Sequence, residues 1–160
     1  MTLTLASTAF AHAGRIPKKY TCDGENVSPP LTISGVPKGT VSLALTMEDP
    51  DIPQFAKEKF GIDVFDHWTL FTIPPSTTEI AEDASSVGKE GVTTSGKTGY
   101  TGPCPPPDHE PKEHRYFFRL YALDAELSLV DGVTKDRVLA AIKGHVLATT
   151  ELMGTYTRAV

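Results

Sequence analysis

Alternating apolar and polar positions predict the strands of this protein. The clearest alternation lies in residues 41–47, 67–73 and 116–123, and it predicts three half-buried or buried strands. In the first segment the odd-numbered positions form the apolar face. In the second segment, strict alternation predicts two opposite faces: His67, Thr69, Phe71 and Ile73 on one, and Trp68, Leu70 and Thr72 on the other. In the third, His114, Tyr116, Phe118 and Leu120 are expected on a common face.

Weaker patterns predict the remaining strands. Residues Leu3–Phe10 suit an edge strand, and Leu31–Ser34 suit a short strand that ends at glycine and proline residues. The segment Gln54–Asp66 is a longer excursion between strands. A last strand is expected at Glu151–Arg158, although Val146–Met153 could also form a helix.

One helix is predicted near the C-terminal end of the chain. Thr134 suits its N-cap, and Asp136 falls in the first turn, where the helix dipole favours a negative charge. Its apolar stripe reaches Ile142, and Gly144 is expected to end it. The polar segment around Glu79–Asp83 suits one further helical turn. Short strands, many turns and a single helix together predict a β-rich domain of two sheets.

Composition narrows the classes of function. With 160 residues, 39% of them hydrophobic and 22% charged, the chain is typical of a single globular domain over residues 1–160. A net charge of −5 argues against a nucleic-acid partner, which requires a basic field. No apolar run approaches the roughly 20 residues that a membrane-spanning helix needs.

The two cysteines, Cys22 and Cys104, are too few for a disulfide scaffold and match no zinc-finger spacing. A single bridge between them is expected only if the protein is exported. The N-terminal residues lack the basic region of a signal peptide and are interpreted as a strand. We therefore expect a cytoplasmic protein, with a periplasmic location as the alternative.

A loop rich in glycine and proline precedes the third strand. Glycines in residues 96–102 permit close approach of the backbone to a ligand, and the prolines of residues 103–111 prevent helix and inner-strand structure. This stiff loop is expected to position His114 and Tyr116 at the start of the sheet strand that follows it. Rigid loops of this kind often carry functional residues.

Polar residues recur at the strand ends. Asp49 follows the first strand, His67 opens the second, and His114 and Tyr116 enter the third. Imidazoles and a phenol can donate hydrogen bonds to a phosphate or carboxylate, while Asp49 would orient a histidine. Each residue also has a structural interpretation: a core histidine bonded to a carbonyl, an aspartate capping a turn, and a tyrosine packing in a sheet.

Two other classes of site use the same residues. Asp49, His67 and His114 form a set of metal-ligand types, to which His109 or Cys104 could add a fourth member. Alternatively, Cys104 could act as the nucleophile of a hydrolase with a histidine as its base. No paired-cysteine or HExxH spacing supports the metal site, and Cys104 is also typical of a small buried apolar residue.

Six motifs carry a family resemblance that spans nearly the whole chain. They are YTCDGENVSPPL from Tyr20, DPDIP from Asp49, DHW from Asp66, GYTGPCPP from Gly99, HRYFFRLYALD from His114 and HVLATTELMGTY from His145. In this order they resemble the phosphatidylethanolamine-binding protein family, which includes Raf kinase inhibitor protein, and specifically its bacterial branch.

The resemblance implies a mainly β fold, an antiparallel β-sandwich of two sheets with a few short helices and an anion pocket at one end. It implies a non-enzymatic protein that needs no cofactor and binds phosphate or a phosphorylated headgroup such as phosphoethanolamine. A kinase or protease partner and a homodimer through an open sheet face are further expectations. The implied ligand-binding residues are Asp49, His67, Cys104, Pro105, Pro106, His114 and Tyr116.

Two departures from the family pattern concern the rim of this pocket. The segment Pro107–Glu113 looks longer than the usual spacer before the HRY motif, so the charge of the rim is expected to differ. The chain ends at Val160 without the C-terminal helix of eukaryotic members, from which we expect a more open site.

Overall fold

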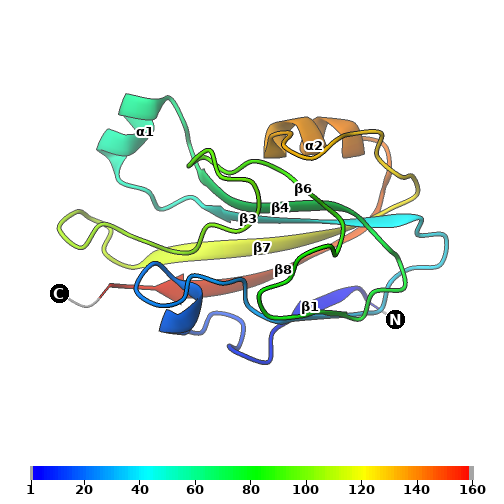
Figure 1. The fold of residues 1–160 in the computed structure, drawn as a ribbon, viewed down its shortest axis with the longest axis horizontal. Coiled ribbons are helices and arrows are strands. Elements are labelled where there is room, and N and C mark those ends of the chain that lie inside the picture. Colours follow the sequence, from blue (N-terminus) through cyan, green and yellow to red (C-terminus); the bar gives the residue numbers. More distant parts are fainter. Residues whose placement is uncertain (1, 159–160) are drawn as a thin grey trace.

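Two antiparallel sheets face each other in the computed structural model, which describes residues 2–158 (Figure 1). The small sheet has the strand order β1-β2-β5 and the large sheet the order β6-β4-β3-β7-β8. The strands are β1 (Thr4–Ala6), β2 (Leu31–Ser34), β3 (Ser42–Asp49), β4 (Phe65–Ile73), β5 (Glu79–Ile80), β6 (Lys89–Glu90), β7 (His114–Leu123) and β8 (Val146–Tyr156). The helices are α1 (Gln54–Phe60), α2 (Lys135–Ile142) and the 3-10 turn η1 (Lys18–Tyr20). The predicted two-sheet antiparallel β-sandwich is confirmed.

Each face of the large sheet is covered by apolar side chains. Between the sheets, Leu5 and Ile33 of the small sheet share a buried core with Leu45, Trp68 and Phe118 of the large sheet. Such burial contributes roughly 25 cal/mol per Å² of apolar surface removed from water. This core explains why the odd-numbered positions of β3 are apolar.

A second core lies between the large sheet and α2. Ala44, Phe71 and Leu123 of the sheet pack there against Val138 and Ile142 of the helix. Figure 1 shows α1 and α2 on the same side of the large sheet, opposite the layer that contains β1. The central strand β3 is therefore buried on both faces from Ser42 to Met47.

Helix α2 begins as the sequence predicts. The Thr134 side chain accepts a hydrogen bond from the backbone amide of Arg137 at 3.2 Å, and Asp136 lies in the first turn. The helix ends at Ile142, two residues before Gly144, which has a left-handed φ of 82°. No helix among residues 2–158 is long and apolar enough to span a membrane.

Other elements differ from the expectations. The segment after β3 forms helix α1, which the sequence pattern did not indicate because none of its residues is buried. The helical turn expected at Glu79–Asp83 is wrong, since Glu79–Ile80 is strand β5. The helical alternative for Val146–Met153 is also wrong, because β8 pairs with β7 along almost its whole length. The N-terminal strand is an edge strand as expected but is shorter than predicted.

A bulge at the start of β4 changes the direction of His67. Met47 pairs with Trp68, whereas its neighbour Glu48 pairs with Asp66, so His67 is one extra residue on β4. Strict alternation would place His67 on the α2 face, and that prediction is wrong. Bulges re-aim side chains in this way, often beside binding sites.

Lys135 of α2 holds the residue that precedes the bulge. Its amine lies 2.6 Å from Asp66 and 2.5 Å from Glu48, and its side chain is almost fully buried. These ion pairs keep Asp66 on the α2 face of the sheet. The following residue, His67, is then free to turn toward the opposite side.

A second irregularity moves Ile73 to the inter-sheet core. The register shifts between Leu43 and Leu45 of β3, and Thr72 on β4 has a left-handed φ of 57°. Ile73 consequently joins the core between the sheets, whereas Phe71 faces α2. The expectation that these two side chains share a face is therefore wrong.

Candidate functional site

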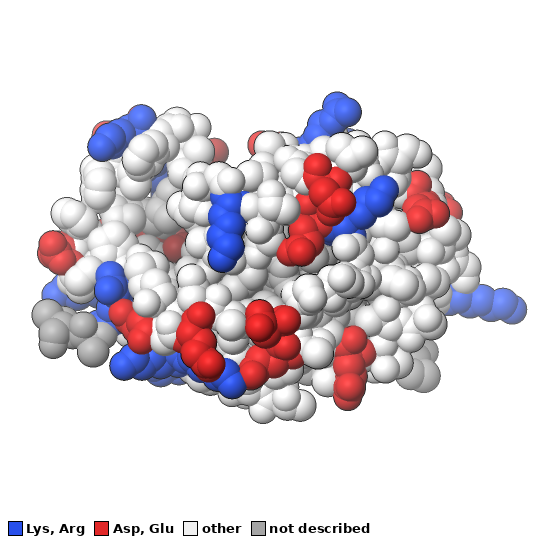
Figure 2. Space-filling view, in the orientation of Figure 1, with Lys and Arg blue, Asp and Glu red and all other residues white. Residues whose placement is uncertain are grey.

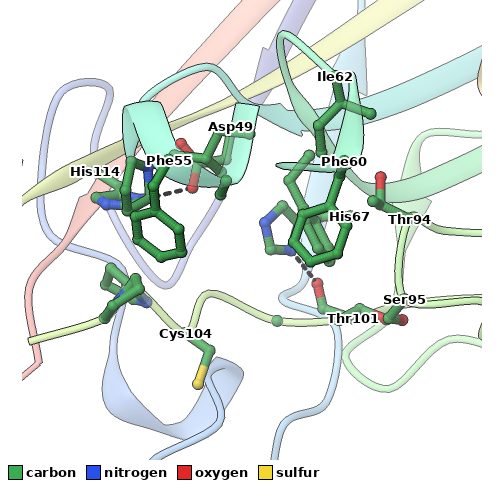
Figure 3. Close-up of a pocket in the computed structure, with 17 residues that line it drawn as sticks. Asp49, Phe55, Phe60, Ile62, His67, Thr94, Ser95, Thr101, Cys104 and His114 are labelled. Atoms are coloured by element: carbon green, nitrogen blue, oxygen red, sulfur yellow. Dashed lines mark hydrogen bonds and ion pairs between the residues drawn. The ribbon is translucent and has the colours of Figure 1, made fainter. Parts of the chain in front are cut away.

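A pocket lies where the central strand of the large sheet ends. Because β3 runs antiparallel to both neighbours, its last residue lies beside the first residues of β4 and β7. Asp49, His67 and His114 meet there and line a cavity of about 480 Å³. The predicted convergence of these three residues is thus observed. Figure 3 shows the Asp49–His114 pair on one side of the cavity and His67 on the other.

Asp49 and His114 form a buried ion pair. His114 Nδ1 lies 2.6 Å from Asp49 Oδ2, and the side chains are 1% and 4% exposed. His114 Nε2 lies 2.9 Å from the carbonyl oxygen of Pro111, so both ring nitrogens face acceptors. This pattern matches a doubly protonated imidazolium. Asp49 Oδ1 also accepts from the Asp51 amide at 2.7 Å, which is the turn-capping role expected from the sequence.

His67 is held by a backbone carbonyl. Its Nδ1 donates to the carbonyl oxygen of Thr101 at 2.6 Å, so the neutral ring carries its proton on Nδ1. Burial lowers the pKa of His67 to about 4, against the opposing effects of the Thr101 carbonyl and Asp49. The ring is therefore neutral at pH 7, and its Nε2 is an acceptor. Figure 3 shows this second nitrogen turned toward the interior of the cavity.

Tyr116 lies behind the other three residues rather than on the wall. Its ring centroid is 5.3 Å from that of His67 in an edge-on arrangement and 6.3 Å from that of His114. Its hydroxyl is buried and has no hydrogen-bond partner among the described residues. Burial, and secondarily the charge of Asp49, raises the pKa of Tyr116, so the phenol stays protonated. Buried hydroxyls rarely lack a hydrogen-bond partner, so the Tyr116 hydroxyl is an exception that needs an explanation.

The turn after Asp49 is fastened to the start of β7. Arg115 forms a bidentate ion pair with Asp51, at 2.8 Å from Nε and 2.9 Å from Nη2, and its backbone amide also donates to Asp51. The hydrogen bond from Arg115 lowers the pKa of the Asp51 carboxyl. These contacts position the neighbouring Asp49 and His114 against each other.

The loop rich in glycine and proline, residues 96–111, forms one wall of the pocket. Gly102 donates to Asn26 Oδ1 at 3.0 Å, and a Cβ at this glycine would lie 2.2 Å from the same oxygen. The Tyr100 hydroxyl donates to the Tyr20 carbonyl at 2.7 Å. Only glycine at position 102 allows the backbone to come this close to Asn26. The contact fixes the neighbouring Thr101, whose carbonyl orients His67.

Cys104 is bonded to Cys22 in a disulfide that closes this loop onto residues 20–26. Cys104 is exposed at the pocket wall, so the expectation of a small buried apolar residue is wrong. The expected wall residues Pro105 and Pro106 line the cavity beside it. A thiol nucleophile at position 104 does not fit this structure, because the sulfur is bonded to another sulfur.

Most of the opposite wall was not predicted. Helix α1 and its flanks supply an apolar surface above the polar base, formed by Ile52, Pro53, Phe55, Ala56, Phe60, Ile62 and Phe65. The side chains of Phe55 and Phe60 are half or more exposed, at 49% and 62%. The only signal in the sequence was the recurrence of phenylalanine in a segment that is otherwise polar.

The donor set of the pocket does not fit a metal ion. Within residues 2–158, no group of three or more His, Cys, Asp or Glu side chains is arranged to hold one. His114 uses both ring nitrogens on other acceptors, and Cys104 is oxidised. The Asp49–His67–His114 combination therefore offers one free nitrogen rather than a ligand set.

Charged side chains are interspersed on the face seen in Figure 2. Acidic and basic residues both occur on it, and no continuous basic field appears on that face.

Comparison with known proteins identifies relatives over the whole chain. The family model described as "Phosphatidylethanolamine-binding protein" matches residues 6–157. A UPF0098 protein from Methanothermobacter thermautotrophicus is 46% identical over 162 aligned residues, which cover 98% of this chain and 99% of the relative.

Solved structures of related proteins have the same fold as this chain. A putative phosphatidylethanolamine-binding protein homologue from Chlamydia trachomatis superposes with a TM-score of 0.91 at 43% identity, covering 99% of both chains. E. coli YBCL, described as a new member of the mammalian family, superposes with a TM-score of 0.86 at 27% identity, covering 99% of this chain and 100% of that one.

Proposed function

The chain belongs to the phosphatidylethanolamine-binding protein family, and on that basis we propose that it is a non-catalytic binding protein for a small phosphate-bearing ligand. The ligand occupies the cavity at the end of β3, with its phosphate at the polar base. A free phosphate or a phosphorylated headgroup would supply the same chemistry.

The observation that carries this proposal is the free Nε2 atom of His67, which faces the cavity (Figure 3). The Tyr116 hydroxyl, directly behind the cavity wall, is a second polar atom without a partner among residues 2–158. A buried polar atom costs free energy unless it forms a hydrogen bond. A phosphate presents several oxygens at once and can satisfy both.

The same geometry supports a binding role rather than catalysis. His114 and Asp49 are bonded to each other and to the backbone, so Nε2 of His67 is the free imidazole nitrogen among the described residues that line the cavity. Incubation with phenyl phosphate should release no inorganic phosphate above a blank without protein. Turnover that disappears in His67→Gln would refute the non-catalytic assignment.

Calorimetric titration with inorganic phosphate tests the binding proposal. We expect saturable binding that weakens about ten-fold or more in Tyr116→Phe, because a hydrogen bond to a charged group is worth roughly 1.5–3 kcal/mol. Tyr121→Phe is the matched control, since it removes a hydroxyl from the same strand on the α2 side. Equal affinity in the parent and Tyr116→Phe would refute the role of the phenol.

We also propose, from the Cys22–Cys104 disulfide, that the protein works in an oxidising compartment such as the periplasm. Thiol labelling of the protein directly after cell lysis tests this, because a protein from a reducing compartment would carry two reactive cysteines. A kinase or protease partner and a homodimer are proposed on family membership alone. Affinity capture and sedimentation measurements would test them.

A further inference from the structure

The polar base of the pocket carries no uncompensated charge. Among residues 2–158, Asp49 is the only carboxylate that lines the cavity, and no lysine or arginine lines it. Both Asp49 oxygens are engaged, one by His114 and one by the Asp51 amide. A ligand ammonium group would therefore find no free carboxylate at the base, and a dianionic phosphate would find no free cation.

The base does offer one free acceptor. His67 keeps its proton on Nδ1 for the Thr101 carbonyl, so Nε2 accepts. The Tyr116 hydroxyl is buried behind this wall and does not line the cavity. A singly protonated phosphate matches the base, because its P–OH can donate to Nε2.

The titratable groups that face His67 do not change this match. Asp49 on β3 favours the charged ring and His114 on β7 disfavours it. Burial acts in the same direction as His114 and dominates, which holds the pKa of His67 near 4. Tyr116 on β7 stays protonated because burial raises its pKa. Between about pH 5 and 8 the base therefore keeps the same acceptor, the Nε2 atom of His67.

The walls next to this base are apolar. Figure 3 shows Phe55 extending from α1 on the side of the Asp49–His114 pair, and Phe60 on the side of His67. The Phe55 ring packs on His109 of the long loop before β7, with centroids 4.7 Å apart, and the Phe65 ring packs on His67 at 4.7 Å. These contacts hold the aromatic wall close to the polar base. A ligand group that extends from the polar base toward solvent therefore contacts the aromatic wall.

We propose that this pocket selects an amphipathic phosphate monoester, in which an aryl or alkyl group is attached to a singly protonated phosphate. The inference rests on the proposed phosphate-binding function and narrows its ligand class. The phosphate lies at His67 Nε2, and the apolar group lies against Phe55 and Phe60. Phosphoethanolamine fits less well, because its ammonium group would find no counter-ion in the pocket. A phosphodiester also fits less well, because its anion has no proton to donate to His67.

Titration calorimetry at pH 6 with four probes tests the selection. The probes are phenyl phosphate, inorganic phosphate, phosphoethanolamine and methyl phenyl phosphate. We expect phenyl phosphate to bind at least ten-fold more tightly than each of the others. Comparable affinity for phenyl phosphate and phosphoethanolamine would overturn the inference but leave the proposed function intact. Absence of binding by all four at millimolar concentration would overturn both.

The pH profile tests the protonated form. The monoanion of a phosphate monoester loses its proton near pH ~6, so the affinity for phenyl phosphate should fall about ten-fold per pH unit above pH 7. The diester does not titrate in this range, and its weaker binding should stay constant between pH 6 and 8. Phenyl phosphate binding that strengthens with pH would identify the dianion as the ligand and overturn this part of the inference.

A surface substitution tests the aromatic wall. Phe60→Ser should remove most of the advantage of phenyl phosphate over inorganic phosphate, measured as the ratio of their dissociation constants. The Phe60 side chain is 62% exposed, so the fold is expected to survive, which thermal unfolding would verify. Val130→Ser is the control, since this residue is 70% exposed and does not line the pocket. An unchanged ratio in Phe60→Ser would contradict the inference.

Discussion

His114 and Asp49 form an ion pair 2.6 Å long in which both side chains are buried, at 1% and 4% exposure. The chain contains a second pair of the same residue types, His145 and Asp124, at 2.8 Å with side chains 47% and 46% exposed. The two pairs share their chemistry and differ in solvent access. The chain therefore provides its own control for the energetic role of burial.

Asp49→Asn should destabilise the protein strongly. Removing one partner of a buried ion pair leaves an uncompensated charge and typically costs about 3–5 kcal/mol. Asp124→Asn should cost less than about 1 kcal/mol, because water screens the exposed pair. Urea unfolding of both variants against the parent measures the difference. Similar losses in the two variants would show that the buried pair has no special role in stability.

His67 should make the protein less stable as the pH falls from neutrality. The folded-state pKa of about 4 lies below the ordinary value near ~6.5, so between these values the unfolded chain binds more protons. Stability is thus fully present above pH ~6.5 and is lost progressively toward pH 4. From pH 7 to pH 5 this linkage predicts a loss of roughly 2 kcal/mol.

His67→Gln separates this effect from the titration of carboxylates. The variant should lose less stability than the parent between pH 7 and pH 5 in urea unfolding. NMR titration of the His67 ring protons should give a midpoint well below 6. A midpoint near 6.5, or equal pH dependence in both proteins, would contradict the neutral buried state of this ring.

The Cys22–Cys104 disulfide should stabilise the protein by closing a long loop. Its cysteines are 82 residues apart, and loss of such a bridge typically costs about 2–4 kcal/mol. A Cys22→Ser/Cys104→Ser double variant should unfold at lower temperature than the oxidised parent. Dithiothreitol should lower the melting temperature of the parent and leave the variant unchanged. An equal response of both proteins to the reductant would argue against the bridge.

Gly102→Ala should disturb the loop that orients His67. The added Cβ would lie 2.2 Å from Asn26 Oδ1 and 2.4 Å from the Tyr20 carbonyl oxygen, so the backbone must move. We expect a loss of about 2 kcal/mol or more, within the range of overpacked sites, together with altered His67 ring resonances. Gly39→Ala is the control: its Cβ meets nothing within 4 Å, and only its left-handed φ costs about 1–2 kcal/mol. Unchanged His67 resonances in Gly102→Ala would contradict the positioning role of the loop.

The main strands and the polar corner of the site could be predicted from local sequence. Alternation identified β3, β4 and β7 because each has at least one face in an apolar core, and period-two patterns report that burial directly. Asp49, His67 and His114 stood out because each lies at the end of such a strand. Antiparallel pairing then brings the end of β3 beside the starts of its neighbours.

Tertiary structure alone decided how these residues are used. The extra residue at His67 reverses the face that alternation assigns to it, and the register of β4 against β3 determines this bulge. Helix α1 has no buried residue, so no apolar stripe announces it, and its phenylalanines form a wall only because the chain folds back over the cavity. The hydrogen bonds that commit His114 and leave the Tyr116 hydroxyl unpaired join strands and loops distant in sequence. Residue types thus specify which groups are available, whereas long-range packing determines which of them keep a free donor or acceptor for a ligand.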